Sequence, residues 1–312
     1  MAFDRKAIRF GKKAESPLAN PNQILTIDVM SVAYASYFGI KVKLSNAGQR
    51  TEVLYGFLDQ LMTFYKTFRT RNIVFCFDSK SSVRKNKYPW YKKRDTKLKE
   101  SEAKKKSEEF EEIFKQVYLL RTEILPSMGF ENIIMQRGYE ADDLVASTVI
   151  HNEGTHTVVT TDQDLFQLLD HCRIYQPRKK ELMTKHLFEE KYQITPEQWV
   201  DVKRLGGCES DKIPGIPRVG EITAIAFIKN ELRAGKTLDS INEDMAKDES
   251  TSAWKRNEWL VRLPLPGTKK VALSFENQVL SIEGFQDVCE EHAFRFLDKK
   301  NRDDWLKFLH QG

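Results

Sequence analysis

The chain has 312 residues, 40% of them hydrophobic and 30% charged, with a formal net charge of +5 at pH 7. This length allows one main domain and a smaller one, and no apolar run is long enough for a membrane span. The N-terminus lacks the apolar core of a signal peptide. The four cysteines have no paired spacing, which argues against disulfides and zinc and favours a reducing cytoplasm.

The first part of the chain alternates between loose and regular segments. Residues 1–22 are basic and punctuated by proline and asparagine, which predicts a flexible arm. The run at 24–27 is short and rich in β-branched residues, which predicts a buried strand, and it ends in Asp28. A second run of this kind, at 73–77, ends in Asp78.

A strongly basic segment follows, with twelve lysines and arginines between Lys80 and Lys106 against three acidic residues. Its second half, at 98–112, has the pattern of a solvated helix face with many salt bridges. Residues 84–94 interleave cations with aromatic rings, a composition that suits a phosphate backbone and exposed bases. This segment is therefore a candidate surface for a polyanion.

Five of the six carboxylates between residues 138 and 164 lie in two groups. Glu140, Asp142 and Asp143 open a segment with the apolar periodicity of a helix. Acidic residues are favoured at the N-terminus of any helix, so this group alone has an ordinary structural explanation. Asp162 and Asp164 follow a third short β-type run.

Three β-type runs thus lead directly into Asp28, Asp78 and Asp162. In an open parallel sheet the carboxyl ends of the strands share one edge, where ligands bind. Carboxylates crowded there repel one another unless some are protonated or a multivalent cation lies among them. Acidic sites made only of oxygen ligands prefer hard ions such as Mg²⁺ or Mn²⁺. The sequence therefore predicts a metal site at this edge, beside a basic segment that would hold a polyanion.

The C-terminal part begins with a helix-start signal at 195–198 and continues into a glycine- and proline-rich stretch at 205–228. A turn of this kind between two helices can present backbone N–H groups and a helix N-terminus to a phosphate. A tight helix–helix connection without a ligand explains the stretch equally well. Beyond residue 232 the chain is predicted to be helical.

In their order and spacing these motifs resemble those of the 5′ nuclease family, which includes flap endonucleases, the 5′–3′ exonuclease domain of bacterial DNA polymerase I and stand-alone phage exonucleases. The motifs are Asp28, Asp78, YEADD at 139–143, TDQD at 161–164 and GCESDKIPG at 207–215. The resemblance covers nearly the whole chain from residue 24. The lack of an attached polymerase, the LPLPG loop and the FENQVL run look most like the tailed-phage branch.

This resemblance implies an α/β fold with a mostly parallel central sheet and helices on both faces. The nuclease core would span 23–200 and include a helical arch at 80–125 over the active site. Residues 201–312 would form a helix–three-turn–helix motif and a C-terminal helical region, with 1–22 as a flexible basic N-terminal arm. The expected location is the cytoplasm, that of the host if a phage encodes the chain.

The resemblance also implies roles for individual residues, numbered as in this chain. A first Mg²⁺ or Mn²⁺ ion would be held by Asp28, Asp78, Glu140, Asp142 and Asp162. A second would be held or oriented, partly through water, by Asp143, Asp164 and Asp211. Arg84 and Lys92 would lie near the scissile phosphate, and Tyr34 would stack on a displaced base. Further DNA contacts would come from Lys93, Arg94, Gly215, Arg218 and Gly220, with K⁺ as an ion that the family's helix–three-turn–helix often holds.

Four features depart from the family's pattern. Val29 stands where the family usually has glycine, and Asp95 where it often has arginine. In the turn, Arg218 replaces a glycine, which costs up to about 1 kcal/mol if φ is positive there, and Ile222 removes a cation expected to face phosphate. Cys208 replaces an aspartate. A protonated thiol is a poor ligand for Mg²⁺, so the second ion is expected to bind weakly.

The sequence therefore predicts a metal-dependent, structure-selective 5′ nuclease (5′–3′ exonuclease or flap endonuclease) that hydrolyses phosphodiesters in DNA or RNA–DNA primer junctions during replication. Branched or 5′-ended DNA is the expected partner, with a replication polymerase or single-strand-binding protein as further partners and a monomer as the expected state. One alternative, favoured by Cys208 and Ile222, is a branched-DNA-binding module with weakened catalysis. Another is a phosphatase of the haloacid dehalogenase type, but the sequence from Asp28 to Met30 lacks the required DxD pattern.

Overall fold

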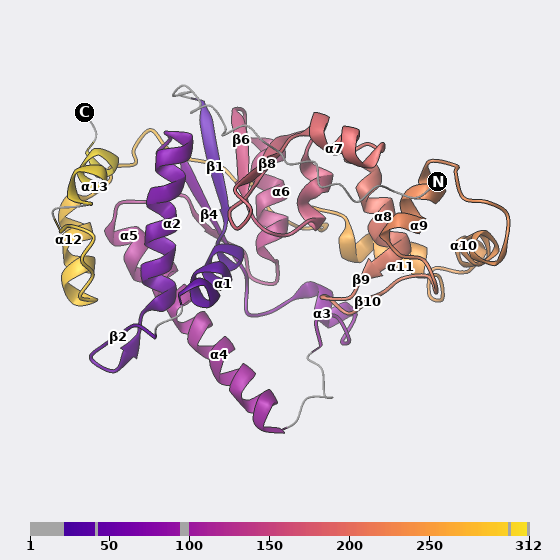
Figure 1. Cartoon of the computed structure of the whole chain (residues 1–312), viewed down its shortest axis with the longest axis horizontal. Coiled ribbons are helices and arrows are strands. Elements are labelled where there is room, and N and C mark those ends of the chain that lie inside the picture. The colour runs from indigo at the N-terminus through magenta and orange to yellow at the C-terminus, as the bar shows by residue number, and fades with distance from the viewer. Residues whose placement is uncertain (1–21, 41–42, 94–99, 299–300, 311–312) are drawn as a thin grey trace.

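The computed structural model describes residues 22–40, 43–93, 100–298 and 301–310, so nearly all of the predicted N-terminal arm lies outside the described residues. At the centre is a six-stranded sheet with the strand order β5-β4-β1-β6-β7-β8 (Figure 1). All neighbouring strands pair in parallel except β8, which runs antiparallel to β7 at one edge. The strands are β1 (Gln23–Asp28), β4 (Ile73–Phe77), β5 (Ile133–Met135), β6 (Thr155–Val159), β7 (Cys172–Gln176) and β8 (Glu181–Met183).

Helices cover both faces of the sheet because its central strands are apolar on both faces. Successive side chains of a strand point to opposite faces, so Phe75 of β4 enters one hydrophobic core and its neighbour Cys76 enters the other. The first core includes side chains of α1 (Val29–Gly39) and α2 (Glu52–Phe68), and the second includes side chains of α6 (Ala141–His151) and α8 (Gln198–Gly206). The predicted α/β class with a mostly parallel sheet is confirmed.

The order β4-β1-β6 places the ends of three strands side by side. Asp28 pairs in register with Cys76, and Ile27 pairs with Val159. The strands therefore end nearly level, and the residues that follow them lie at one edge of the sheet. The acidic residues predicted to meet there come from this edge and from the start of α6.

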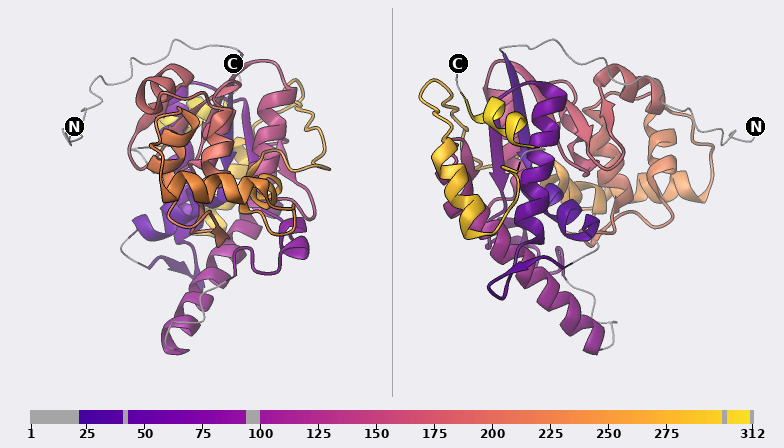
Figure 2. Two further views of the ribbon diagram at one scale, coloured as in Figure 1. Left: turned by 90° about the vertical axis from the view of Figure 1, so that its right-hand side faces the viewer. Right: turned by 60° about the vertical axis from the view of Figure 1, so that its left-hand side comes forward.

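The basic segment forms α3 (Val83–Lys87) and α4 (Glu100–Leu119). α4 continues through a π-helical turn at Leu120–Ile124 into α5 (Leu125–Ser127). It extends well away from the sheet in both views of Figure 2, as the predicted arch requires. Residues 94–99, and with them the predicted DNA contact of Arg94, lie outside the described residues.

The aromatic residues of the basic segment were expected to suit exposed bases, but they face the protein to a large extent. Tyr88 and Trp90 contact each other, and Tyr88 also contacts Trp259 of α11 (Ala253–Val261). Tyr91 is only 2% exposed. These rings therefore attach the base of the arch to α11, because aromatic rings of this size are stabilised by burial against one another.

The chain after the sheet contains the predicted turn between two helices. α8 leads into a short antiparallel hairpin of β9 (Gly207–Cys208) and β10 (Ile213–Pro214), and α9 (Glu221–Ile228) follows. The other elements are β2 (Ser45–Asn46), β3 (Gln49–Arg50), a 3₁₀ helix at Asp164–Leu168, α7 (Lys185–Tyr192), α10 (Lys236–Ala246), α12 (Ile282–Glu291) and α13 (Arg302–Leu309).

The C-terminal region does not form one separate body. α9, α10 and α11 lie at one end of the molecule, whereas α12 and α13 return to the opposite end, beside α5 and α2 (Figure 1). The predicted division at residue 200 falls within α8 and stays a prediction. Among the described residues, no helix has both the length and the apolar character needed to cross a membrane.

Candidate active site

Asp28 forms the centre of the acidic edge. It caps α1, where its Oδ1 accepts a hydrogen bond from the Ser31 amide at 3.2 Å, and its Oδ2 accepts one from the Thr160 hydroxyl at 2.9 Å. Burial and then the charge of Asp78 raise the pKa of Asp28 to about 7. In the absence of a cation this carboxyl group is therefore largely protonated below neutral pH.

The pKa values of neighbouring acids are raised as well. Asp78 accepts a hydrogen bond from the Ala141 amide at 2.7 Å, yet the loss of surrounding water still raises its pKa. The pKa of Asp142 is raised well above its usual value by burial, Asp162 and Asp28. Desolvation, and then the negative charge of Asp164, raise the pKa of Asp162. Such a cluster stores protons that a multivalent cation can replace.

Glu140 lies beside this cluster and contacts the base of the arch. Its Oε2 accepts hydrogen bonds from the Lys92 ammonium at 2.8 Å and the Tyr91 hydroxyl at 2.9 Å. Burial alone would raise the pKa of Glu140, but the charges of Lys92 and Arg84 hold it below its usual value. Lys92 also lies 3.7 Å from Asp211, so one ammonium group connects two predicted metal ligands.

A second group of ligands consists of Asp164, Cys208 and Asp211, whose potential ligand atoms all lie within 4.8 Å of one another. The Lys203 ammonium contacts Asp164 at 2.8 Å. Burial raises the pKa of Asp211 to about 6, although Lys92 opposes the shift. Burial and Asp164 also raise the pKa of the Cys208 thiol, which is therefore protonated near neutral pH.

These two groups fit divalent cations. Lys92 and Lys203 already place positive charges against the carboxylates, and several of the acids retain protons without further cations. The ligand atoms are carboxylate oxygens apart from the thiol of Cys208, and hard ions such as Mg²⁺ or Mn²⁺ prefer oxygen. The structure thus brings together seven of the eight acids expected at the metals: Asp28, Asp78, Glu140, Asp142, Asp162, Asp164 and Asp211.

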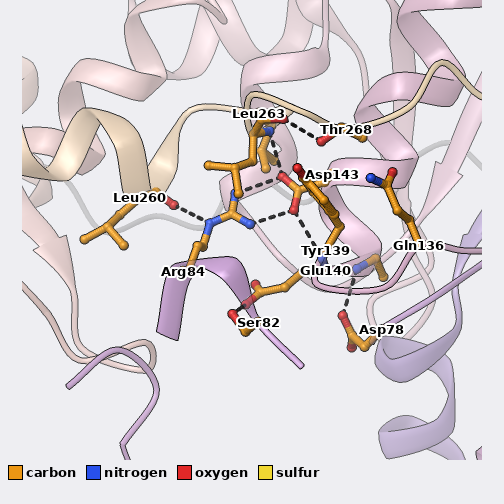
Figure 3. Close-up of polar contacts among 12 residues, drawn as sticks. Asp78, Ser82, Arg84, Gln136, Tyr139, Glu140, Asp143, Leu260, Leu263 and Thr268 are labelled. Carbon is orange, nitrogen blue, oxygen red and sulfur yellow. Dashed lines mark hydrogen bonds and ion pairs between the residues drawn. The ribbon is translucent and has the colours of Figure 1, made fainter. Parts of the chain in front are cut away.

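Asp143 is the eighth; it is fully buried, and Figure 3 shows its polar contacts. Its two oxygens accept four hydrogen bonds, from the Arg84 guanidinium at 2.6 and 2.8 Å, the Glu140 amide at 3.1 Å and the Leu265 amide at 2.9 Å. A carboxylate has about four acceptor positions, so none is left for a metal. Of the two roles predicted for Asp143, holding or orienting the second ion, these contacts fit orienting, and that role stays a prediction.

Arg84 is likewise buried, with 2% of its surface exposed. Its two terminal nitrogens donate to Asp143, and its Nε donates to the Leu260 carbonyl at 3.0 Å (Figure 3). These bonds use three of the five N–H donors of the guanidinium group and hold it against Asp143. The sequence pattern reports spacing and not the face on which a side chain lies, so the place of Arg84 near the scissile phosphate stays a prediction.

An open cleft of about 1900 Å³ connects the acidic edge to the arch. Tyr34 and Lys93, both predicted to contact DNA, line this cleft together with Lys92. Aromatic rings of α4, including Phe114 and Tyr118, form part of the same wall. A cleft that combines cations and aromatic rings suits a single strand of nucleic acid.

The turn between α8 and α9 contains the other three predicted DNA contacts. Gly215 lies so close to Gly206 that an added Cβ would meet its carbonyl carbon at 2.3 Å, which requires glycine there. Arg218 has a φ of +70°, so it adopts the strained backbone expected where it replaces a glycine. Gly220 precedes α9, and its position leaves open space around an added Cβ.

Two residues of the site were not identified as ligand partners from the sequence. Tyr91 was grouped with the aromatic residues for bases, but its hydroxyl donates to Glu140 and to Asp211 at 3.3 Å. Lys203 lies in the last turn of α8 and carries no motif that distinguishes it from a surface lysine. Only the fold places that turn beside Asp164.

A parallel sheet with acidic side chains at its carboxyl edge, beside a basic cleft, defines the class of metal-dependent phosphodiesterases. A family model described as "5'-3' exonuclease, N-terminal resolvase-like domain" matches residues 23–193. The chain belongs to this 5′–3′ exonuclease family, so the resemblance inferred from the motifs is confirmed.

Curated relatives agree with this assignment. The chain is 30% identical over 238 residues to a 5′–3′ exonuclease of Bacillus subtilis, covering 73% of this chain and 75% of the relative. It is 31% identical over 223 residues to a thermostable DNA polymerase I of Thermus thermophilus, covering 70% of this chain and 25% of the relative. The chain thus spans about a quarter of the length of that polymerase.

Solved structures support the fold. The D15 protein of bacteriophage T5, co-crystallised with metal ions, has a TM-score of 0.61 at 18% identity, covering 92% of this chain and all of the other. Flap endonuclease-1 from Methanococcus jannaschii has a TM-score of 0.57 at 16% identity, covering 93% of each chain. At this identity the likeness concerns the fold alone.

Proposed function

We propose that this protein is a divalent-metal-dependent 5′ nuclease that hydrolyses phosphodiester bonds in branched or 5′-ended DNA. The observation that carries the proposal is the convergence of seven acids, of which Asp78, Glu140 and Asp211 line a cleft whose walls also carry lysines and aromatic rings. Membership of the 5′–3′ exonuclease family supports cleavage that starts from the 5′ end. Replication, including removal of RNA–DNA primers, is the process that this activity would serve.

The roles of the residues follow from their contacts. Asp28, Asp78 and the other acids of the edge would hold two Mg²⁺ or Mn²⁺ ions, which supply an activated water and offset charge on the phosphate when bound. Lys92 extends from the arch toward the same position, where its ammonium would stabilise charge on a phosphate oxygen. Tyr91 holds Glu140 and Asp211 in place through its hydroxyl.

The second ion would bind more weakly than the first. Its three candidate ligands include the protonated thiol of Cys208 and leave only Asp164 and Asp211 as carboxylates. Mn²⁺ tolerates softer ligands than Mg²⁺ does, so it should fill this position more readily. A K⁺ ion at the turn between α8 and α9 is a further part of the proposal.

The substrate would lie across both ends of the site. Duplex DNA would contact Gly215, Arg218 and Gly220 in the turn, and the 5′ strand would enter the cleft beside Tyr34 and Lys93. A T5 flap endonuclease variant of the same fold was solved as a pseudo-enzyme-product complex with DNA and metal ions. The protein would act as a monomer, and a phage would encode it. Its partners would be a replication polymerase or a single-strand-binding protein.

The direct test uses labelled 5′-flap, nicked and single-stranded oligonucleotides with Mg²⁺ or Mn²⁺, followed by sizing of the products. We expect cleavage near the 5′ end or the branch point, and none in excess chelator. Binding of flap DNA without cleavage in either metal would favour the alternative, a branched-DNA-binding module. Equal cleavage of substrates with a 5′ flap and of substrates with a 3′ flap would contradict a 5′ nuclease.

A further inference from the structure

We propose that Arg84 is a positioning residue that acts through Asp143 to fix the metal-binding carboxylate of Glu140. The inference rests on the proposed function in one respect, because it takes Glu140 as a ligand of the first metal ion. It assigns to Arg84 a role different from contact with the scissile phosphate.

The pair is an almost completely buried ion pair between the base of the arch and α6. Both terminal nitrogens of Arg84 donate to Asp143, and the side chains of the two residues are 3% and 0% exposed. The Nε of Arg84 donates to the Leu260 carbonyl, and Asp143 accepts from the Leu265 amide. The pair therefore connects α3, α6 and the chain segment that leaves α11.

Asp143 transmits this arrangement to Glu140. The same Oδ2 atom that accepts from Arg84 at 2.6 Å also accepts from the Glu140 amide at 3.1 Å. Glu140 is the N-cap residue of α6, and the next amide, that of Ala141, donates to Asp78. Any shift of this first turn would therefore move two acids of the metal site together (Figure 3).

Glu140 needs such support because its side chain is drawn toward the arch. Lys92, Tyr91 and, at 3.4 Å, Ser82 all donate to its carboxylate from that side. From the side of α6, Glu140 and Asp143 form a capping box, in which the Asp143 carboxylate accepts from the Glu140 amide. A group hydrogen-bonded behind a ligand commonly changes metal affinity by about 10- to 100-fold when it is removed.

The direction in which metal affinity changes when Arg84 is substituted distinguishes a positioning role from a purely electrostatic one. A positive charge near the site repels a divalent cation, so removing the charge of Arg84 should strengthen metal binding if charge alone matters. Loss of positioning should weaken it. The geometric role also requires the planar fork of arginine, which lysine lacks. Arg84→Lys keeps the charge and removes the fork, whereas Arg84→Met removes both.

The experiment titrates Mn²⁺ into the full chain without nucleic acid and follows free Mn²⁺ by electron paramagnetic resonance. We expect Arg84→Lys and Arg84→Met to weaken the tighter Mn²⁺ site by about 10-fold, with unchanged far-UV circular dichroism. Lys85→Met is the matched control, because Lys85 is exposed on the same helix and carries the same charge. This control should bind Mn²⁺ as tightly as the wild type or slightly more tightly.

Wild-type Mn²⁺ affinity in Arg84→Lys would overturn the proposal, as would tighter binding in Arg84→Met. If Arg84→Met fails to fold, Arg84→Lys decides the question, because it retains a cation for buried Asp143. The titration contains no DNA, so it is independent of cleavage. Failure of the wild type to cut any oligonucleotide would overturn the proposed nuclease and leave the result on Arg84 intact.

Discussion

The ammonium of Lys92 lies at the acidic edge, 2.8 Å from Glu140. Lys105 is also part of the basic segment, but it is exposed on α4. Lys92→Ala should therefore lower the single-turnover cleavage rate by about 100-fold, with a much smaller loss of binding. Lys105→Ala should only flatten the salt dependence of binding slightly. Equal effects of the two substitutions would remove the special role of Lys92.

Cys208 limits the second metal position, because its protonated thiol takes the place of an anionic oxygen among the three candidate ligands. Cys208→Asp should strengthen the weaker Mn²⁺ site and raise activity at low Mg²⁺ concentration. Cys208→Ser serves as the control, since it removes the sulfur without adding a charge. Equilibrium Mn²⁺ titration and the Mg²⁺ dependence of cleavage measure both effects. An aspartate variant no better than the wild type in either assay would show that this position does not limit the site.

Helix α9 presents an apolar side chain where a cation was expected to face phosphate. Ile222 is 84% exposed, so a longer polar side chain fits there without repacking. Ile222→Lys should tighten binding to duplex DNA and steepen the dependence of log affinity on log salt by about one unit. Val279→Lys is the control, because Val279 is 68% exposed and precedes α12 at the opposite end of the molecule. An equal gain in both variants would indicate nonspecific attraction.

At the level of elements, the sequence predicts the strands, which depend on hydrophobic periodicity. It does not predict the side-chain contacts that depend on how the elements pack. The strands before Asp28 and Asp78 are recognisable because short apolar runs end in a polar residue, and parallel strands bring such ends together. The bonds from Arg84 to Asp143 could not be predicted, because the spacing of Arg84 from Lys92 is compatible with either face of α3. Lys203 has no signal at all, since its place beside Asp164 depends on how α8 packs on the sheet.

For the molecule as a whole, crowding of acids at one edge makes stability depend on pH in the absence of metal. The folded-state pKa of Asp28 is about 7 and that of Asp211 about 6, whereas an unfolded aspartate has a pKa of about 3.9. Between these values the folded state binds more protons than the unfolded state, so stability falls as pH rises.

We therefore expect the thermal midpoint of the metal-free protein to decrease from about pH 5 to about pH 8. Mg²⁺ should raise the midpoint more at the higher pH, because ionised carboxylates bind the cation. Differential scanning calorimetry with chelator or Mg²⁺ measures both trends. Asp28→Asn should give a flatter pH dependence than the wild type. A midpoint that rises with pH in chelator would contradict this description of the acidic edge.

The central claim is that the acids at the sheet edge hold the metal ions that cleave DNA, and Asp162→Asn tests it most directly. Asparagine keeps the size of the side chain. It also keeps an oxygen that can accept the hydrogen bond that the Asp164 amide donates to Asp162 at 2.8 Å. The variant should lose single-turnover cleavage of a 5′-flap substrate in Mg²⁺ and retain flap binding, by fluorescence anisotropy, within several-fold of the wild type. Asp239→Asn, an exposed acid on α10, should cleave normally. Wild-type cleavage by Asp162→Asn would contradict the location of the active site.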